Sequence, residues 1–365
     1  MHPLLLTFLI FGVPAAIALV YIFVRGTSAM RRYIVTRIAL TVPMVIILAT
    51  LVFFVMRILP GDPVTSALGP KGSPEVKELL RENLGLNDPL LVQYGRFLGN
   101  MLTFDFGESL IGAHRPISDE LGERLPATLE LIIPATAFAL TIGISFGTWA
   151  AVRRKRASDY GFRLYGVVSY AMPIFWLGLL FQLLFGVVLG WAPIAGRIDA
   201  LIGTTLKRET NFVVIDSIIT GNWAALGSAL HHLILPTLTL GIVLSGVFLR
   251  LTRINVIETL QEDYVTAARA RGIRATTVTY GYALKNAMIP VITLIGLQVA
   301  ILLAGAVLTE TVFSWPGMGR YLVERISSRD FTAVQSTITM FALFVAMISL
   351  AVDIIYSLLD PRVKY

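Results

Sequence analysis

Long apolar segments recur along the chain, and they constrain its fold more than any other feature of the sequence. Each is close to the roughly 20 residues that a helix needs to cross the hydrocarbon core of a bilayer. Only 15% of the 365 residues are charged, against about 25% in soluble domains. We therefore predict an all-α polytopic membrane protein. Its seven predicted spans are residues 4–24, 38–56, 127–152, 164–189, 233–251, 288–308 and 336–359.

The placement of arginine and lysine predicts the orientation of these spans. No lysine or arginine precedes the first span, which favours a retained helix over a cleaved signal peptide. Basic residues in short loops stay on the cytoplasmic side. Four arginine-rich segments alternate with the other loops, at residues 25–37, 153–163, 250–285 and the C-terminal tail. We expect the N-terminus outside and the C-terminus in the cytoplasm, so the net charge of +7 reflects topology and not nucleic-acid binding.

The polar segment of residues 57–126 is predicted to be a folded insertion of two or three helices on the outer side. Ser73, Pro74 and Glu75 form a helix start, with a capping side chain, a proline at the first position and an acid in the first turn. Gly85 is placed to end this helix. The next helix is expected to begin near Pro89.

Several chemistries are excluded by missing residues. The chain has no cysteine, which excludes disulfides, thiolate metal sites and cysteine nucleophiles. It has no GxxxxGK(S/T) phosphate loop and no HExxH motif. His231 and His232 are adjacent, so on a helix they point about 100° apart and make poor joint ligands. No metal site is predicted.

One segment does fit a catalytic pattern, because residues 143–147 read Gly-Ile-Ser-Phe-Gly and match GxSxG. An intramembrane serine hydrolase that uses Ser145 is therefore one alternative function. The motif, however, requires a strand, a sharp turn and a helix, whereas this segment lies within an apolar span. Gly143 and Gly147 are better explained as small residues that let two helices approach closely.

Ionisable and amide side chains inside or at the ends of spans are costly and often functional. Gln298, Glu310 and Asp353 are such residues. They either line a transport pathway or form hydrogen bonds between helices, and the sequence leaves both interpretations open. An ion-coupled secondary transporter with Asp353 as its ion site is a second alternative function.

A polar segment of about thirty residues, from Glu262 to Pro290, separates the fifth and sixth spans. It begins with helix-forming residues, and Ala267 and Ala268 leave a surface that another protein could approach closely. Gly272 permits a turn that a side chain would hinder. From these residues alone, the segment is either a docking element for a protein or a helix on the membrane surface.

Ordered motifs along the chain resemble the permease subunits of binding-protein-dependent ABC importers, in particular the first permease of dipeptide, oligopeptide and nickel importers. Residues 266–272, TAARARG, resemble the EAAxxxG signature, with Thr266 in place of the usual glutamate and Ile289-Pro290 as its closing element. The resemblance covers residues 30–365. The other matching segments are LPGDP (59–63), LNDPL (86–90), FDFGESL (104–110), FSWPGMG (313–319), RDF (329–331) and DPR (360–362).

This resemblance implies a type I ABC importer permease fold in the cytoplasmic (inner) membrane, with a six-helix core in residues 30–365 and one extra helix in residues 1–29. Residues 60–126 would be the extracytoplasmic insertion, and residues 253–287 the cytoplasmic coupling-helix region. The implied substrates are di- or oligopeptides, with nickel chelates or glutathione as alternatives. The implied partners are a homologous second permease in a heterodimer, two cytoplasmic ABC ATPases and an extracytoplasmic substrate-binding protein. The chain would then be no enzyme and bind no cofactor, because ATP and Mg²⁺ belong to the ATPases.

In this family the Ala-Ala-Gly segment is the coupling helix, which fits a groove of the ATPase. Carried over, Ala267, Ala268 and Gly272 would make the close contact. ATP-driven closure would push this helix and convert an outward-open cavity into an inward-open one. The candidate polar contacts are Glu262, Asp263, Thr266, Arg269 and Arg271.

Overall fold

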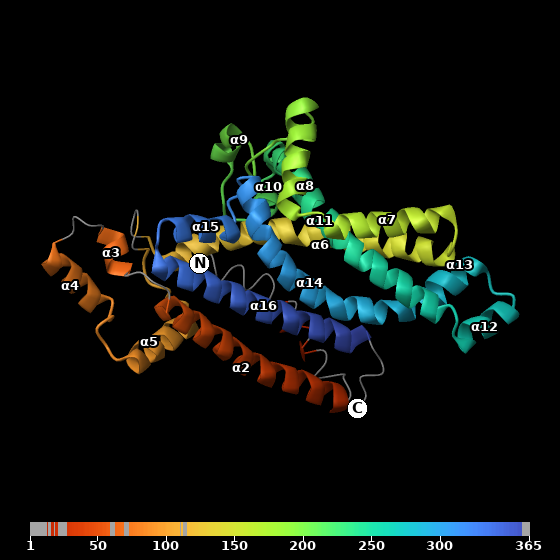
Figure 1. Ribbon diagram of the computed structural model, residues 1–365, viewed down its shortest axis with the longest axis horizontal. Helices are drawn as coiled ribbons and strands as arrows, with labels where there is room; N and C mark the ends of the chain where they lie inside the picture. The colour runs from red at the N-terminus through yellow and green to blue at the C-terminus, as the bar shows by residue number, and fades with distance from the viewer. Residues whose placement is uncertain are drawn as a thin grey trace.

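The computed structural model describes residues 28–58, 63–68, 73–109, 111 and 115–359, with a few isolated positions before residue 28. These residues form helices and one isolated β-bridge, between Glu108 and Pro116. The long helices run mostly along the long axis of the molecule (Figure 1). They are α2 (Ser28–Ile58), α6 (Ile117–Val152), α11 (Trp223–Thr259), α14 (Leu284–Val312) and α16 (Phe331–Leu359).

The predicted all-α, multi-span fold is confirmed. Five helical segments are long and apolar enough to cross a membrane, and a bent pair of helices provides a possible sixth crossing among the described residues. The predicted first span, residues 4–24, lies outside the described residues except for a few isolated positions, and motif residues 59–62, 110 and 360–362 also lie outside them. The total of seven spans and the orientation of the termini stay predictions.

The predicted fourth span, residues 164–189, coincides with the bent pair and is not one continuous helix. α7 (Ala157–Ala171) ends before Pro173, and the axis turns by 102° into the segment Ile174–Val188. Proline lacks a backbone N–H and disfavours helical geometry in the residue before it, and Met172 is indeed extended, with φ −74° and ψ 128°. α8 consequently stands across the long helices in Figure 1. The two parts of Ile174–Val188 are α8 (Ile174–Phe181) and the π-helical η1 (Gln182–Val188).

The predicted insertion contains three helices at one end of the molecule (Figure 1). The Ser73 side chain accepts a hydrogen bond from the Val76 N–H at 3.3 Å, which confirms the predicted cap. Gly85, with φ +64°, ends the same helix as predicted. The helices are α3 (Pro63–Leu68), α4 (Pro74–Asn83) and α5 (Leu90–Thr103). α6 begins at Ile117, within the range that the sequence assigned to the insertion.

Close packing of α6 against α11 forms the centre of the core. A Cβ built on Gly143 would lie 2.5 Å from the Cβ of Phe248, and one on Gly147 would lie 2.7 Å from the carbonyl oxygen of Leu249. The predicted packing role of both glycines is therefore confirmed. Ser145 lies in the same continuous helix and is exposed, without the strand and sharp turn of a hydrolase nucleophile.

Replacing Gly147 with leucine is expected to force α6 and α11 apart and to lower the free energy of unfolding. Overpacking typically costs about 1–3 kcal/mol, and here the nearest atoms belong to the α11 backbone and to Thr252. Thermal unfolding of the purified protein in detergent measures the effect. Gly161→Leu on α7 is the matched control, because nothing lies within 4 Å of a Cβ at that position. Equal melting temperatures for the two variants would contradict this account of the core.

Candidate functional site

The polar segment between α11 and α14 folds into a small helical element at the end of the molecule opposite α3–α5 (Figure 1). α11 leads into it and α14 follows it, so the element is connected along the chain to two long helices. The element consists of α12 (Asp263–Ala270), α13 (Ala275–Thr277) and the π-helical η2 (Val278–Ala283).

The inner face of α12 packs against the chain's own core. Val265 and Ala268 are three residues apart and so lie on one helix face, where they are buried against Val278. The Tyr264 hydroxyl accepts a hydrogen bond from the Asn286 side chain at 2.8 Å, which joins α12 to α14. These contacts attach α12 to η2 and to the start of α14.

Gly272 ends α12 in the way that the sequence predicted. Its φ is +74°, a left-handed conformation in which glycine carries no steric penalty. The Gly272 N–H donates to the Arg269 carbonyl at 3.0 Å, and the Ile273 N–H donates to the Ala268 carbonyl at 3.3 Å. This is the Schellman pattern of a helix end. A Cβ on Gly272 would meet nothing within 4 Å, so the turn, and not a lack of room, requires glycine.

The outer face of α12 is exposed and consists mainly of small side chains. It is formed by Asp263, Thr266, Ala267 and Ala270, which lie opposite Val265 and Ala268 at helical spacing. A partner protein can approach closely over the two alanines. Ala270 is not among the predicted coupling residues, because its place on this face follows only from the inward direction of Val265.

The remaining predicted coupling residues divide between the two ends of α12 and its inner face. Glu262 is exposed just before the helix. Arg269 and Arg271 are exposed at its end, where the helix dipole stabilises positive charge. Ala268 was predicted to make the close contact with an ATPase. The structure instead turns it inward, with 4% of its surface exposed, because it fills the space beside Val265 and Val278.

At the opposite end of the molecule, two of the motif segments meet. The Ser109 hydroxyl, from the segment at residues 104–110, donates to Asp330 at 2.6 Å, and Asp330 belongs to the RDF segment. Asp330 is fully buried and also accepts the Ala333 N–H at 3.1 Å in the first turn of α16. This contact joins the end of the insertion to the last long helix.

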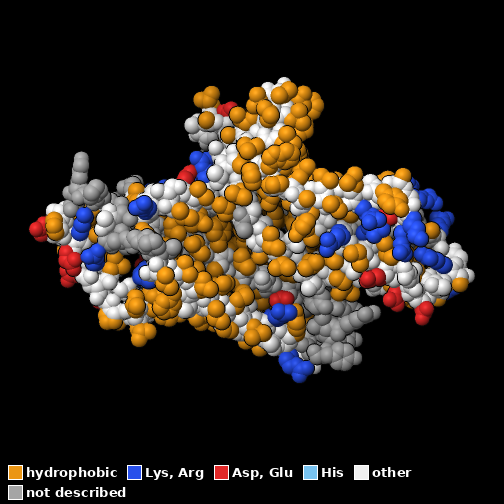
Figure 2. Space-filling view, in the orientation of Figure 1, with side chains coloured by type: hydrophobic (Ala, Val, Ile, Leu, Met, Phe, Trp, Pro, Cys, Tyr) orange, Lys and Arg blue, Asp and Glu red, His pale blue; other side chains and the backbone are white. Residues whose placement is uncertain are grey.

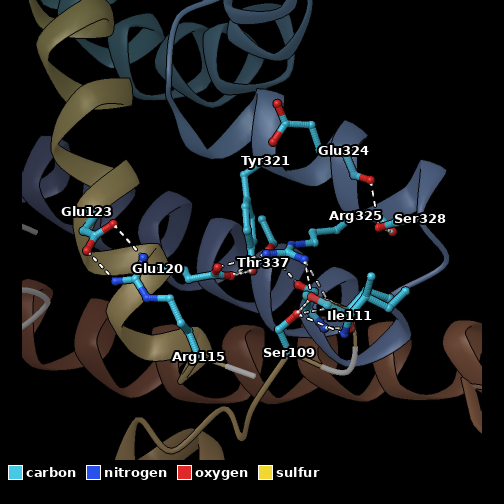
Figure 3. Close-up of polar contacts among 12 residues, drawn as sticks. Ser109, Ile111, Arg115, Glu120, Glu123, Tyr321, Glu324, Arg325, Ser328 and Thr337 are labelled. Carbon is cyan, nitrogen blue, oxygen red and sulfur yellow. Dashed lines mark hydrogen bonds and ion pairs between the residues drawn. The ribbon is translucent and has the colours of Figure 1, made fainter. Parts of the chain in front are cut away.

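Arg325 extends this contact into a buried polar network (Figure 3). It lies on α15 (Met318–Ser327) and donates to both carboxylate oxygens of Glu120 at 2.9 Å and to the Ile111 carbonyl at 3.1 Å. The Tyr321 hydroxyl also donates to Glu120. Burial raises the pKa of Tyr321, which keeps the phenol protonated and able to donate. Because these residues are about 200 positions apart in the chain, no local pattern in the sequence could have paired them.

Glu310, one of the three candidate pathway residues, is fully buried and attaches the FSWPGMG segment to α6. It accepts the Thr128 hydroxyl at 2.6 Å and the Arg320 N–H at 3.0 Å. A Cβ on Gly317 would lie 2.2 Å from this carboxylate, which explains the glycine there. The Trp315 ring N–H adds a hydrogen bond to the Ala127 carbonyl at 2.8 Å.

The other two candidates lie on the long helices. Asp353 accepts the Tyr33 hydroxyl at 3.3 Å and pairs with Arg37 at 3.5 Å, so it connects α16 to α2. Gln298 is half-buried on α14. Glu310 and Asp353 thus both form contacts between helices, and a role of any of the three in lining a pathway stays a prediction.

A buried ion pair holds the long loop between η1 and α11 against α6. Arg197 donates to Glu130 at 2.6 Å and to the Asn211 carbonyl at 2.8 Å, while the Val214 N–H donates to the second Glu130 oxygen at 2.7 Å. The loop contains two short helices that were not predicted, α9 (Ala200–Thr205) and α10 (Val213–Ile219).

The two adjacent histidines contact separate backbone carbonyls. His231 lies 2.8 Å from the Trp191 carbonyl and His232 lies 2.8 Å from the Ser228 carbonyl. Within the described part of the chain, no three His, Asp or Glu side chains are placed to hold a metal ion.

Comparison with known proteins supplies the context for this arrangement. Residues 143–365 match the family described as binding-protein-dependent transport system inner membrane component, and residues 30–132 match the N-terminal part of such components. The chain is 41% identical to the di/tripeptide transport system permease protein DppB of Pseudomonas aeruginosa (strain UCBPP-PA14) over 337 residues, 92% of this chain and 99% of the relative. It is 38% identical to the dipeptide transport system permease protein DppB of Escherichia coli (strain K12), over 92% and 99% of the two chains. It is 36% identical to the glutathione transport system permease protein GsiC of Salmonella paratyphi A, over 92% and 100%.

Proposed function

Because the chain belongs to the family of binding-protein-dependent transport system inner membrane components, we propose that it is the permease of an ATP-driven peptide importer. Its multi-span helical fold and its place in this family make it a transport component of the inner membrane and not a catalytic subunit. The observation that supports a peptide as the substrate is the 41% identity to a di/tripeptide permease along 99% of that protein. Import of glutathione or of a nickel chelate through the same architecture is the alternative within this class.

The partners in this proposal are a homologous second permease, two cytoplasmic ABC ATPases that carry ATP and Mg²⁺, and an extracytoplasmic substrate-binding protein. The arginine-rich loops support a cytoplasmic position for the end with α12. The insertion with α3–α5 then faces the binding protein. The separation of these two elements at opposite ends of the molecule suits a protein that responds to a different partner on each side of the membrane (Figure 1).

Coupling to the ATPase is assigned to the exposed face of α12. Ala267 and Ala270 allow close approach, and Glu262, Asp263, Thr266, Arg269 and Arg271 surround them with polar groups. Ala268 and Gly272 contribute indirectly, because Ala268 fixes the inner face and Gly272 fixes the end of the helix. Movement of α12 then tilts α11 and α14 together, as a two-state change driven by different contacts in each state.

Transport by reconstituted vesicles tests this function. The complete importer is expected to accumulate a labelled dipeptide when the ATPase side receives ATP, and to continue when the proton gradient is collapsed. Transport without ATP, or its loss with the gradient, would instead support an ion-coupled transporter. Ser145→Ala should transport normally, since an intramembrane hydrolase alone would require that hydroxyl. Uptake of glutathione or of a nickel chelate, without uptake of dipeptides, would show that the alternative substrate is the correct one.

A further inference from the structure

Four consecutive cationic side chains occupy the turn between α6 and α7: Arg153, Arg154, Lys155 and Arg156. All four are exposed, and Figure 2 shows Lys and Arg side chains gathered at this end of the molecule. These four cations do not belong to the docking element around α12, which lies on a separate stretch of the chain.

The turn carries no acidic side chain that could neutralise these four cations. The nearest acid in the sequence, Asp159, is 1% exposed and is bound by Arg253 through two hydrogen bonds of 2.7 and 2.9 Å. Asp159 also accepts the backbone N–H of Lys155 at 3.0 Å, which fixes the shape of the turn. Among the ion pairs of the described residues, none involves a side chain of the turn. The turn is therefore a fixed site with a local excess of positive charge.

Aromatic side chains beside the turn indicate its depth relative to the membrane. Trp149 is 46% exposed, and the Arg153 guanidinium lies 5.0 Å from its ring centroid. Tyr160 is 57% exposed, with the Arg163 guanidinium 5.8 Å from its ring. Trp and Tyr are enriched at the boundary between membrane and water. The cations follow Trp149 by four to seven residues in the chain, so they lie at the level of the lipid headgroups.

We propose that the α6–α7 turn binds the phosphate headgroup of an anionic phospholipid in the cytoplasmic leaflet. Guanidinium groups contact phosphate oxygens in pairs, and lysine adds a point charge. Clusters of four or more basic residues next to a span are typical of sites for anionic lipid. The exposed apolar residues Val152 and Leu164, on either side of the turn, are suited to acyl chains and not to an acidic protein surface. The inference rests on the proposed function only for the cytoplasmic position of the turn.

Lipid binding to the full-length permease in nanodiscs tests this site. Spin-labelled phosphatidylglycerol is expected to be retained more strongly than spin-labelled phosphatidylcholine. Changing the four cations together to glutamine should weaken the phosphatidylglycerol preference by about tenfold or more, given the typical contribution of each charge near an anionic surface. The control Lys77→Gln with Arg81→Gln, which neutralises basic residues on α4 at the other end, should leave the preference unchanged.

Three results would overturn the proposal: an unchanged lipid preference in the glutamine variant, an equal loss in the α4 control, or displacement of the lipid by millimolar inorganic phosphate. A charge-preserving variant with lysine at all three arginine positions keeps the test valid if the glutamine variant inserts poorly. This variant should retain part of the preference, and full loss in it would contradict a charge-based site. Copurification of the ATPase separates the two hypotheses, because a variant that loses lipid but keeps the ATPase leaves the permease function intact.

Discussion

Ala267→Arg is expected to abolish ATP-driven transport while the permease still folds and inserts. Ala267 is exposed on the outer face of α12, so a longer side chain does not disturb the packing of Val265 and Ala268. It does occupy the space that a closely fitted ATPase surface needs. Residues at the centre of a packed interface dominate binding, so ATPase binding should weaken by about tenfold or more. Copurification of the ATPase with the permease measures binding, and uptake of a labelled dipeptide measures transport.

The controls for Ala267→Arg separate lost docking from lost folding. Ala224→Arg places the same side chain on an exposed alanine at the start of α11, and it should bind the ATPase and transport normally. Ala267→Ser keeps the side chain small and should also be active. Gly272→Asn should be milder than Gly272→Val, because asparagine tolerates the left-handed conformation and valine does not. Normal ATPase binding by the Ala267→Arg variant would contradict the assignment of α12 as the docking helix.

Glu130→Ala is expected to be the most destabilising of the substitutions considered. It leaves the Arg197 guanidinium buried without its carboxylate and removes the acceptor of the Val214 N–H. Both side chains of the pair are 6% exposed, and loss of one partner of such a pair typically costs about 3–5 kcal/mol. We expect a lower free energy of unfolding in detergent and faster proteolysis of the loop that contains α9 and α10.

A double substitution provides the control for this pair. Glu130→Leu with Arg197→Met removes both charges at similar volume, and such replacements of buried pairs are often neutral. The double variant should therefore be more stable than Glu130→Ala. Arg115→Ala, which removes an exposed partner of Glu123, should change the free energy of unfolding by less than about 1 kcal/mol. Equal effects of the buried and the exposed changes would show that the Arg197 pair does not hold the loop.

The sequence predicted best those features that depend on neighbouring residues. The length of the apolar segments identified the described spans. Both ends of α4 were predicted, its start from the side chain of Ser73 and its end from the backbone freedom of Gly85. The bend at Pro173 was also visible in the sequence, because proline in a span interrupts its hydrogen bonds. A proline alone does not predict such a bend, because lipid-buried helices often tolerate proline, as α6 does at Pro134.

Features that depend on distant parts of the chain could not be predicted. Ala267 and Ala268 are identical in type and differ only in which way they face, and the position of Val278 after the turn decides that direction. The network of Glu120, Arg325 and Asp330 joins segments about 200 residues apart. The fold brings these charges together and leaves each of the three side chains largely buried.

The exposure of residue 267 tests the central claim of this account most directly. The chain has no cysteine, so Ala267→Cys introduces a single thiol. A membrane-impermeant maleimide is added to right-side-out and to inverted vesicles, with and without the ATPase subunits. We predict labelling only in inverted vesicles, and protection when the ATPase is bound. Labelling from the outside, or labelling that the ATPase does not change, would contradict the assignment of α12 as a cytoplasmic docking helix.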